Sequence, residues 1–196
     1  MIKRELYMSR IRPFIGGELI KVMTGIRRSG KSVMLDLIKE ELVESGIDSA
    51  QFISINFEDM RYAYLCNAQV LHEEILHRAE TIQGKVYLFF DEIQEVKDWE
   101  KCINSLRVAL DCDIYITGSN AKLLSGELAT YLGGRYVEFV IYPFSFAEFL
   151  ELYRPIAPQA SIQQCFQKYL LSGGMPYLAN LRYAEEPSRQ YLTDVF

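Results

Sequence analysis

The stretch "GIRRSGKS", Gly25 to Ser32, consists of a glycine, four further residues and then Gly-Lys-Ser. This spacing is typical of the phosphate-binding loop, in which backbone N–H groups and a lysine surround phosphate oxygens. At ordinary glycine usage the pattern arises by accident in about one chain per hundred of this size. The residues around the stretch therefore decide whether it binds a nucleotide or is an ordinary glycine turn.

The sequence predicts a strand before this loop and a helix after it. The apolar segment "ELIKVMTG" is typical of a short strand, and "KSVMLDLIKEELVESG" has the apolar spacing of a helix. A helix that begins directly after the glycines points its positive dipole end at a bound anion. We therefore expect a nucleotide to be bound by the loop residues Gly25, Ile26, Arg27, Arg28, Ser29, Gly30, Lys31, Ser32 and Val33.

Strands and helices continue to alternate beyond the loop. Further apolar strands are predicted at "QFISINF", "KVYLFFDE", "DIYITGS" and "YVEFVI", separated by helices over 68–82, about 99–110 and 121–131. Because parallel strands need crossover connections, this alternation predicts an α/β fold with a five-stranded parallel sheet and helices on both faces. Ligands of such sheets bind at the carboxyl ends of the strands.

Two carboxylates end the strand "VYLFF", about sixty residues after the loop lysine. We expect Lys31 to reach the β and γ phosphates, and Ser32 and Asp91 to hold Mg²⁺. The second carboxylate, Glu92, is expected to polarise the attacking water. A buried strand can end in two acids by chance, but the order and spacing relative to the loop favour a nucleotide site.

Polar residues also end the strand "DIYITGS", namely Thr117, Ser119 and the following Asn120. A polar side chain at this place can contact the attacking water or the γ-phosphate, and we favour Asn120 over Ser119 as such a sensor. The alternative is a polar turn that caps the next helix, a role that serine and asparagine fill well.

Two further positions have alternative interpretations. Asn56, at the end of "QFISIN", either donates a hydrogen bond to Glu92 or forms a turn. Arg135, in "YLGGRY", is a candidate arginine finger, because the transition state of phosphoryl transfer is stabilised by an added positive charge. A surface arginine without a catalytic role is the alternative. If Arg135 acts on another subunit, the protein must self-associate.

Basic residues gather in and before the loop. Residues 1–32 contain eight Lys and Arg against two Glu, and since the whole chain has a net charge of −5, the rest carries −11. This suits a polyphosphate site, whereas a nucleic-acid groove needs more positive charge elsewhere, so we expect no nucleic-acid partner for this chain. Within the loop, Arg27 and Arg28 pair either with phosphate or with Glu58 and Asp59.

Composition and hydropathy indicate a globular protein of the cytoplasm. Apolar residues make up 49% of the chain and charged residues 24%, as in ordinary folded domains. The N-terminal segment has no signal-peptide core, and no apolar run approaches the roughly 18 residues of a membrane span. We therefore expect a cytoplasmic location and no membrane partner.

The sequence changes in character after residue 142. The segment "YPFSFAEFLELYRPIAPQAS" combines three prolines with a helix, and the spacing of Ile162, Phe166, Tyr169 and Leu170 marks a second helix. We divide the chain into a nucleotide-binding core over 1–142 and a helical lid region over 143–196. Because "SRQYLTDVF" ends within a helical pattern, we expect a further C-terminal domain.

Together these segments resemble the P-loop NTPases of the AAA+ superfamily, in particular the archaeal-type ATPase group found in bacteria and archaea. The similar segments lie between about residues 18 and 180. They are "TGIRRSGKS", "DEIQEVKDWE", "YITGSNAKLLSGELATYLGGRYVEF", "YPFSFAEFL" and "YLLSGGMPYL". The tract that follows Asp91 is more distinctive than the loop itself.

The resemblance implies a sheet of order 5-1-4-3-2, numbered along the chain, followed by a helical lid. It also implies ATP and Mg²⁺ as ligands, with Gly25, Gly30, Lys31 and Ser32 in the loop, Asp91 and Glu92 as the acidic pair and Asn120 as the sensor. The arginine finger is less well defined in this group. Its members usually continue into a C-terminal domain similar to restriction-type nucleases.

We expect an ATPase whose hydrolysis drives a rearrangement in an attached domain or a protein partner. The alternative is a nucleotide switch that binds ATP and turns over slowly. A small-molecule kinase is less favoured, because the sequence shows no arginine-rich lid over an acceptor site. A GTPase is disfavoured, because "NAKL" at Asn120 lacks the acid of the guanine-reading motif.

Overall fold

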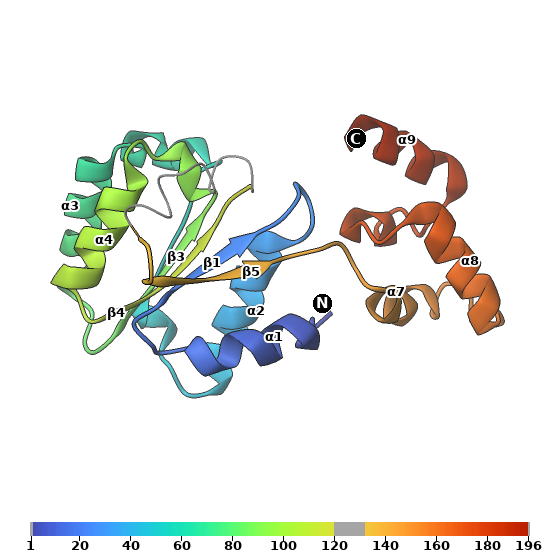
Figure 1. Cartoon of the computed structure of the whole chain (residues 1–196), viewed down its shortest axis with the longest axis horizontal. Helices are drawn as coiled ribbons and strands as arrows, with labels where there is room; N and C mark the ends of the chain where they lie inside the picture. Colours follow the sequence, from blue (N-terminus) through green and yellow to red (C-terminus); the bar gives the residue numbers. More distant parts are fainter. Residues whose placement is uncertain (1, 120–131, 196) are drawn as a thin grey trace. The chain divides into compact units, whose positions relative to one another are not determined.

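The computed structural model describes residues 2–119 and 132–195. Contacts between Cα atoms divide them into two compact units (Figure 1). We call the first the sheet unit, made of residues 5–25, 31–119 and 132–141, and the second the helical unit, made of residues 2–4, 26–30 and 142–195. The middle of the glycine loop, residues 26–30, thus belongs to the helical unit by its contacts.

The sheet unit is built on five parallel strands in the order β2-β3-β4-β1-β5. They are β1 (Ile20–Thr24), β2 (Phe52–Asn56), β3 (Val86–Asp91), β4 (Cys112–Thr117) and β5 (Tyr136–Val140). The predicted α/β fold and strand order are confirmed. In this order β1, which leads into the loop, and β4 are neighbours, and β4 lies between β1 and β3.

Helices cover both faces of this sheet (Figure 1). They are α1 (Glu5–Ile11), α2 (Lys31–Glu44), α3 (Ala68–Ala79) and α4 (Trp99–Ala109). Apolar residues of α3 and α4 pack with Leu88, Phe90 and Ile116, whereas those of α1 and α2 pack with Phe89 and Tyr115. Successive strand residues point to opposite faces, so both faces of the central strands are buried. The helix expected at 121–131 lies outside the described residues.

A buried ion pair joins β1 to β4 near the amino ends of these strands. The side chains of Lys21 and Asp113 are fully buried and pair with each other. Asp113 Oδ2 also accepts hydrogen bonds from the Tyr115 hydroxyl and from the backbone N–H of Gly16, each at 2.7 Å. Burial lowers the pKa of Lys21, and the negative charge of Asp113 opposes that shift. Because a buried charge is costly without its partner, this pair fixes the register of the strand that carries the loop.

The helical unit contains α7 (Phe146–Tyr153), α8 (Ile162–Ser172), α9 (Glu185–Val195) and a short 3-10 helix, η5 (Pro176–Ala179). Two of its helices, α7 and α8, begin with a capping box. The side chain of Ser145 or Ser161 accepts a hydrogen bond from the backbone N–H three residues later, and the side chain of that later residue accepts one from the serine backbone N–H. Its core contains Phe149, Cys165, Met175, Leu178 and Tyr183.

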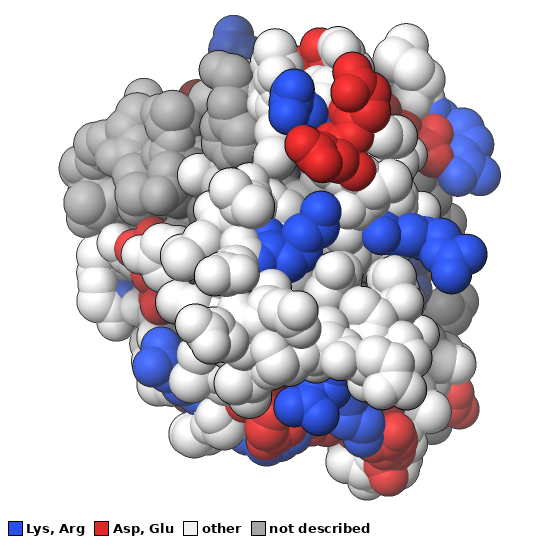
Figure 2. Space-filling view, turned by 90° about the vertical axis from the view of Figure 1, so that its right-hand side faces the viewer, with Lys and Arg blue, Asp and Glu red and all other residues white. Residues whose placement is uncertain are grey.

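The second predicted lid helix is present as α8, but most of its predicted apolar face is exposed. Ile162 is 60%, Phe166 44% and Leu170 67% exposed, whereas Cys165 packs into the core of the helical unit. Figure 2 shows a face of the molecule on which uncharged residues form a broad area with charged residues of both signs around it.

Helix α1, which precedes β1 in the chain and buries Tyr7, Met8 and Ile11, was not predicted from the sequence. Among the described residues, no helix is long and apolar enough to cross a membrane.

Candidate nucleotide site

The glycine loop connects the carboxyl end of β1 to the first turn of α2. Gly25 has a φ of 143° and Gly30 a φ of 100°, which are values that residues with a Cβ rarely adopt. These two glycines therefore allow the turns on either side of the loop. Ser29 and Lys31 are buried, whereas Ser32 and Val33 are exposed in the first turn of α2.

The side chain of Lys31 reaches back across the loop. It is 4% exposed, and its Nζ lies 3.4 Å from the Gly25 carbonyl oxygen and 3.6 Å from Glu92 Oε1. The ammonium group therefore lies between the loop and the carboxyl end of β3. A phosphate group bound in the loop would compete with Glu92 for this lysine.

Thr117 joins the two carboxylate residues that follow β3. Its hydroxyl donates a hydrogen bond to Asp91 Oδ1 and accepts one, at 2.9 Å, from the backbone N–H of Glu92. Thr117 is fully buried at the end of β4, and Asp91 is 6% exposed. The threonine thus fixes one oxygen of Asp91 and the backbone that carries Glu92. Thr117 was predicted as a polar residue at a strand end, but this contact was not predicted.

Glu92 has a left-handed backbone, with φ 55° and ψ 49°, which is uncommon for a residue other than glycine. Its carboxylate is oriented by two neighbours: Oε2 accepts a hydrogen bond from Gln94 Nε2 at 2.5 Å, and Oε1 faces Lys31. Gln94 was not predicted, and its position two residues after Glu92 in "DEIQ" was the one available signal. The acidic pair is thus held by Lys31, Thr117 and Gln94.

The site fits a triphosphate and a hard divalent cation. The N-terminus of α2, the loop backbone and Lys31 supply positive charge for phosphate. The hydroxyl of Ser32 and the carboxylate of Asp91 are oxygen donors, which Mg²⁺ prefers. Thr117 binds one oxygen of Asp91, so the other oxygen of that carboxylate can serve as a ligand.

Asn56 forms a turn in the structure. It is paired in register with Asp91 across β2 and β3, and its Oδ1 accepts a hydrogen bond from the backbone N–H of Glu58 at 2.9 Å. Of the two interpretations of Asn56, this contact supports the turn. Asn120, the predicted sensor, lies outside the described residues.

Arg135 lies at the amino-terminal edge of the sheet, directly before β5. Its backbone oxygen accepts a hydrogen bond from Ile20 at the start of β1, and its Nη1 donates one to Asn104 Oδ1 of α4, each at 2.9 Å. Asp91 and Glu92 lie at the opposite, carboxyl-terminal edge. The structure therefore does not bring Arg135 to the acidic pair of its own chain.

Arg28 has a partner other than the two that the sequence suggested. Within the helical unit, its guanidinium lies 5.5 Å from the centroid of the Tyr191 ring of α9. Asp59, one of the proposed acidic partners, pairs with Arg61 at 2.5 Å. Arg27 is exposed.

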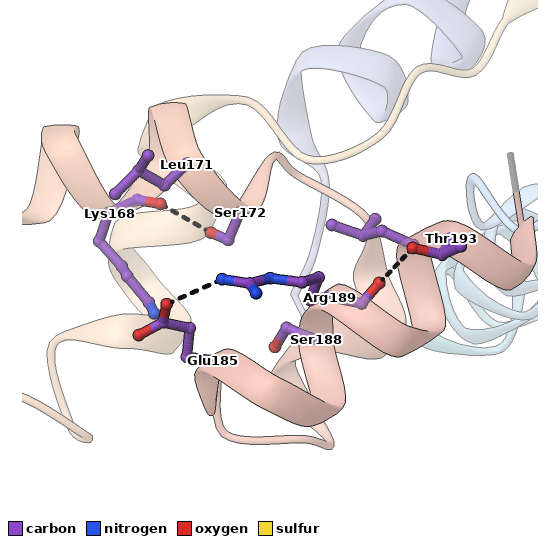
Figure 3. A pocket seen from close by; sticks show the side chains of 8 residues that line it. Lys168, Leu171, Ser172, Glu185, Ser188, Arg189 and Thr193 are labelled. Atoms are coloured by element: carbon purple, nitrogen blue, oxygen red, sulfur yellow. Dashed lines mark hydrogen bonds and ion pairs between the residues drawn. The ribbon is translucent and has the colours of Figure 1, made fainter.

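A separate cavity of about 310 Å³ lies between α8 and α9 of the helical unit (Figure 3). Two of its polar side chains make local contacts along α9: Arg189 pairs with Glu185, and the Thr193 hydroxyl donates a hydrogen bond to the Arg189 carbonyl oxygen. It is lined by Lys168, Leu171, Ser172, Glu185, Ser188, Arg189, Leu192 and Thr193, and thus by no loop residue.

Known proteins are similar to this chain in sequence and in fold. An uncharacterized protein of Haemophilus influenzae is 42% identical over 190 residues, which cover 97% of this chain and 47% of that protein. An uncharacterized protein of Methanocaldococcus jannaschii is 34% identical over 189 residues, covering 90% of this chain and 41% of that protein. The chain thus spans less than half the length of these relatives.

The structure of AMPPCP-bound DnaA from Aquifex aeolicus has a similar fold, with a TM-score of 0.53 and 15% identity. The similarity covers 98% of this chain and 67% of that one. The sequence profile of the family described as AAA domain matches residues 18–150, which include the loop, the acidic pair and all five strands. This chain belongs to the AAA domain family, within the AAA+ superfamily of P-loop ATPases.

Proposed function

We propose that this chain binds ATP with Mg²⁺ in the glycine loop and hydrolyses it. The observation that carries the proposal is the convergence of Lys31, Asp91 and Glu92 where β1 and β3 end, with Thr117 fixing the acidic pair. Family membership supports it, and so does the similar fold of DnaA, which was solved with AMPPCP, an ATP analogue.

Each residue has a role that its position supports. Loop N–H groups and Lys31 bind the phosphates, and Ser32 and Asp91 hold Mg²⁺, which when bound neutralises charge on the phosphate oxygens. When phosphate draws Lys31 away, Oε1 of Glu92 loses its ion pair and can accept a hydrogen bond from the attacking water. Gln94 keeps the same carboxylate oriented through Oε2. Asn120 keeps its proposed role as a sensor of the γ-phosphate.

Hydrolysis would drive a rearrangement in an attached domain or in a protein partner. The curated relatives are more than twice as long as the matched region, so such proteins contain further chain that the ATPase can act on. Residues 26–30 of the loop also belong by their contacts to the helical unit, which links loop occupancy to that unit. Arg135 acts as an arginine finger only on the nucleotide of a second copy, because of its place at the far edge of the sheet.

A slow nucleotide switch is the second candidate function. The observation in its favour is that both oxygens of Glu92 already have partners, Lys31 and Gln94, which limits its availability as a base. A switch would bind ATP tightly and release phosphate rarely.

The substitution Glu92→Gln tests the proposal. It keeps the shape of the side chain but removes the charge that polarises water, so we expect phosphate release to fall about a hundredfold while ATP binding persists. Phosphate release and binding of a fluorescent ATP analogue should be measured in parallel. Binding without any phosphate release by the unsubstituted protein would support the switch instead, and absence of ATP binding would contradict both functions.

A further inference from the structure

The side chain of Arg4 is buried within the helical unit, with 2% of it exposed. Its Nε donates to Glu148 Oε1 at 2.8 Å, Nη1 to the Ser29 carbonyl oxygen at 3.1 Å, and Nη2 to the Tyr142 carbonyl oxygen at 2.8 Å. The guanidinium also lies 5.2 Å from the centroid of the Phe144 ring. One side chain therefore contacts the glycine loop, the segment before α7 and α7 itself.

The contact with Ser29 determines how the loop backbone points. A trans peptide is planar, so the carbonyl of Ser29 and the N–H of Gly30 point in opposite directions. Because Arg4 holds the carbonyl, the N–H of Gly30 is directed away from Arg4. Loop N–H groups are the donors that bind phosphate oxygens, so the orientation of this peptide bears directly on binding.

Arg4 lies beside Gly30 as well as Ser29. A Cβ added to Gly30 would come into ordinary van der Waals contact with Arg4 Nη1, at 3.6 Å, and with Cγ of Pro176 in η5, at 4.0 Å. The guanidinium is therefore about one methyl group away from the Gly30 backbone. A reorientation of the peptide between Ser29 and Gly30 breaks the hydrogen bond that Arg4 donates to the Ser29 carbonyl oxygen.

The other end of the Arg4 contact is the first turn of α7. Glu148 Oε2 accepts a hydrogen bond from the Ser145 backbone N–H at 2.7 Å, and the Ser145 hydroxyl accepts one from the Glu148 backbone at 3.3 Å. The carboxylate that binds Arg4 is thus also half of the capping box that begins α7. A displacement of Arg4 would therefore act on the first turn of α7 through a single residue, Glu148.

We propose that Arg4 is a positioning residue that couples nucleotide occupancy of the glycine loop to the first turn of α7. It orients the peptide between Ser29 and Gly30 for phosphate, and through Glu148 it passes a change of that peptide to α7. The proposal rests on the proposed ATP binding and names the residue through which the helical unit responds to it.

The geometry requires arginine at this position. A guanidinium presents donors in a planar fork, so it can bind a carboxylate and two carbonyls on different sides at once. A lysine at position 4 has a single ammonium group, which can keep the ion pair with Glu148 but cannot also reach Ser29 and Tyr142 in the same directions. Arg4→Lys therefore separates the ion pair from the contact with the loop.

The test compares the unsubstituted chain with Arg4→Lys, Glu148→Gln and the control Arg12→Lys. Arg12 is likewise an arginine in ion pairs, in its case with Glu5 and Glu41, but it lies on the surface of the sheet unit. Two quantities are measured: the Kd of a fluorescent ATP analogue with Mg²⁺, and the change in amide hydrogen exchange of α7 when AMPPCP and Mg²⁺ are added. The difference between bound and free states reports coupling, because a purely structural defect changes exchange in both.

In the unsubstituted chain and in Arg12→Lys, we expect nucleotide to slow exchange in α7. Arg4→Lys should raise the Kd about tenfold, as expected for one lost charged hydrogen bond, and abolish the slowing in α7. Glu148→Gln should keep the Kd within about twofold and reduce the slowing. This second variant carries the test should Arg4→Lys fail to fold.

The proposed coupling is contradicted if folded Arg4→Lys and Glu148→Gln bind nucleotide as tightly as the unsubstituted chain and nucleotide slows exchange in α7 to the same extent. A failure of the unsubstituted chain to bind nucleotide would instead overturn the proposed function, and the coupling with it.

Discussion

At the scale of single residues, the hydroxyl of Thr117 acts both as a hydrogen-bond donor and as an acceptor. It donates to Asp91 and accepts from the N–H of Glu92, inside a fully buried position. A buried polar group that loses its partner costs more than the hydrogen bond contributed. The acidic pair therefore depends on a residue that itself does no chemistry.

The isosteric substitution Thr117→Val should lower the free energy of unfolding by about 1–3 kcal/mol, because a buried carboxylate oxygen and a buried N–H lose their partner. It should also slow phosphate release more than it weakens ATP binding, since Glu92 is displaced and Lys31 is not. Denaturant unfolding and steady-state phosphate release measure the two effects. Thr117→Ser, which keeps the hydroxyl, is the matched control, and equal behaviour of the two variants would contradict this role.

The loop and the acidic pair could be predicted from the sequence because each is a run of adjacent residues with a fixed spacing. Gly25, Lys31 and Asp91 all lie where their motifs put them. The contacts of Thr117 with Asp91 and of Arg4 with Ser29 join residues 26 and 25 positions apart. They depend on which strands are neighbours and on how the N-terminal segment folds back, which no local pattern encodes.

At the scale of elements, α7 and α8 of the helical unit differ in the burial of large apolar side chains. Phe149 of α7 is fully buried and stacks with Tyr153 at 5.0 Å between ring centroids, whereas Leu171 of α8 is 83% exposed. A helical period in the sequence reveals an apolar face but not what covers it. The helices could thus be predicted, and the exposure of the α8 face could not.

Phe149→Ala should lower the free energy of unfolding of the helical unit by about 3–5 kcal/mol, because it leaves a cavity at a fully buried position. Leu171→Ala, at an exposed position, should change it by less than about 0.5 kcal/mol. Thermal unfolding of both variants makes the comparison. A similar loss for the two would show that the core of the helical unit is not centred on Phe149.

The Glu148 carboxylate in the first turn of α7 should make the stability of the chain depend on pH in the acidic range. Burial raises the pKa of Glu148, but hydrogen bonds from Arg4 and from the Ser145 backbone outweigh burial and hold the pKa below its ordinary value of 4.5. A lowered carboxylate pKa contributes stability above the ordinary value, and that stability is lost as pH falls through the folded value.

We therefore expect the unsubstituted chain to be more stable than Glu148→Gln at neutral pH. This advantage should shrink as pH falls below about 4.5, since Glu148 then takes up a proton. Thermal unfolding of both proteins between pH 7 and pH 3 tests this. An advantage that stays constant over the whole range would mean that the charge of Glu148 contributes nothing.

At the scale of the whole molecule, the acidic pair lies at the carboxyl-terminal edge of the parallel sheet, whereas Arg135 lies at its amino-terminal edge. Strand order could be predicted only through the resemblance to AAA+ ATPases, since periodicity identifies strands but not their neighbours. Once the order is known, a cis role for Arg135 conflicts with the topology, because the residue precedes β5 whereas the acidic pair follows β3.

If Arg135 serves a second copy, hydrolysis must depend on association. We expect phosphate release per chain to rise with protein concentration, and Arg135→Ala to lower release at high concentration without weakening ATP binding. Arg107→Ala, at an arginine of α4 that lies outside the loop, is the control. Release per chain that does not change across the association range would contradict the trans role.

Every proposed role of the site residues requires that the glycine loop bind a triphosphate. The most direct test of that binding is an isothermal titration of ATP with Mg²⁺. The unsubstituted chain should bind one ATP per chain, and Lys31→Ala should weaken binding about a hundredfold through loss of charged hydrogen bonds to phosphate. Lys39→Ala, which removes a partly exposed lysine of the same helix that pairs with Asp36, should bind as the unsubstituted chain does. Equal affinity of Lys31→Ala and the unsubstituted chain, or no binding by either, would contradict the account.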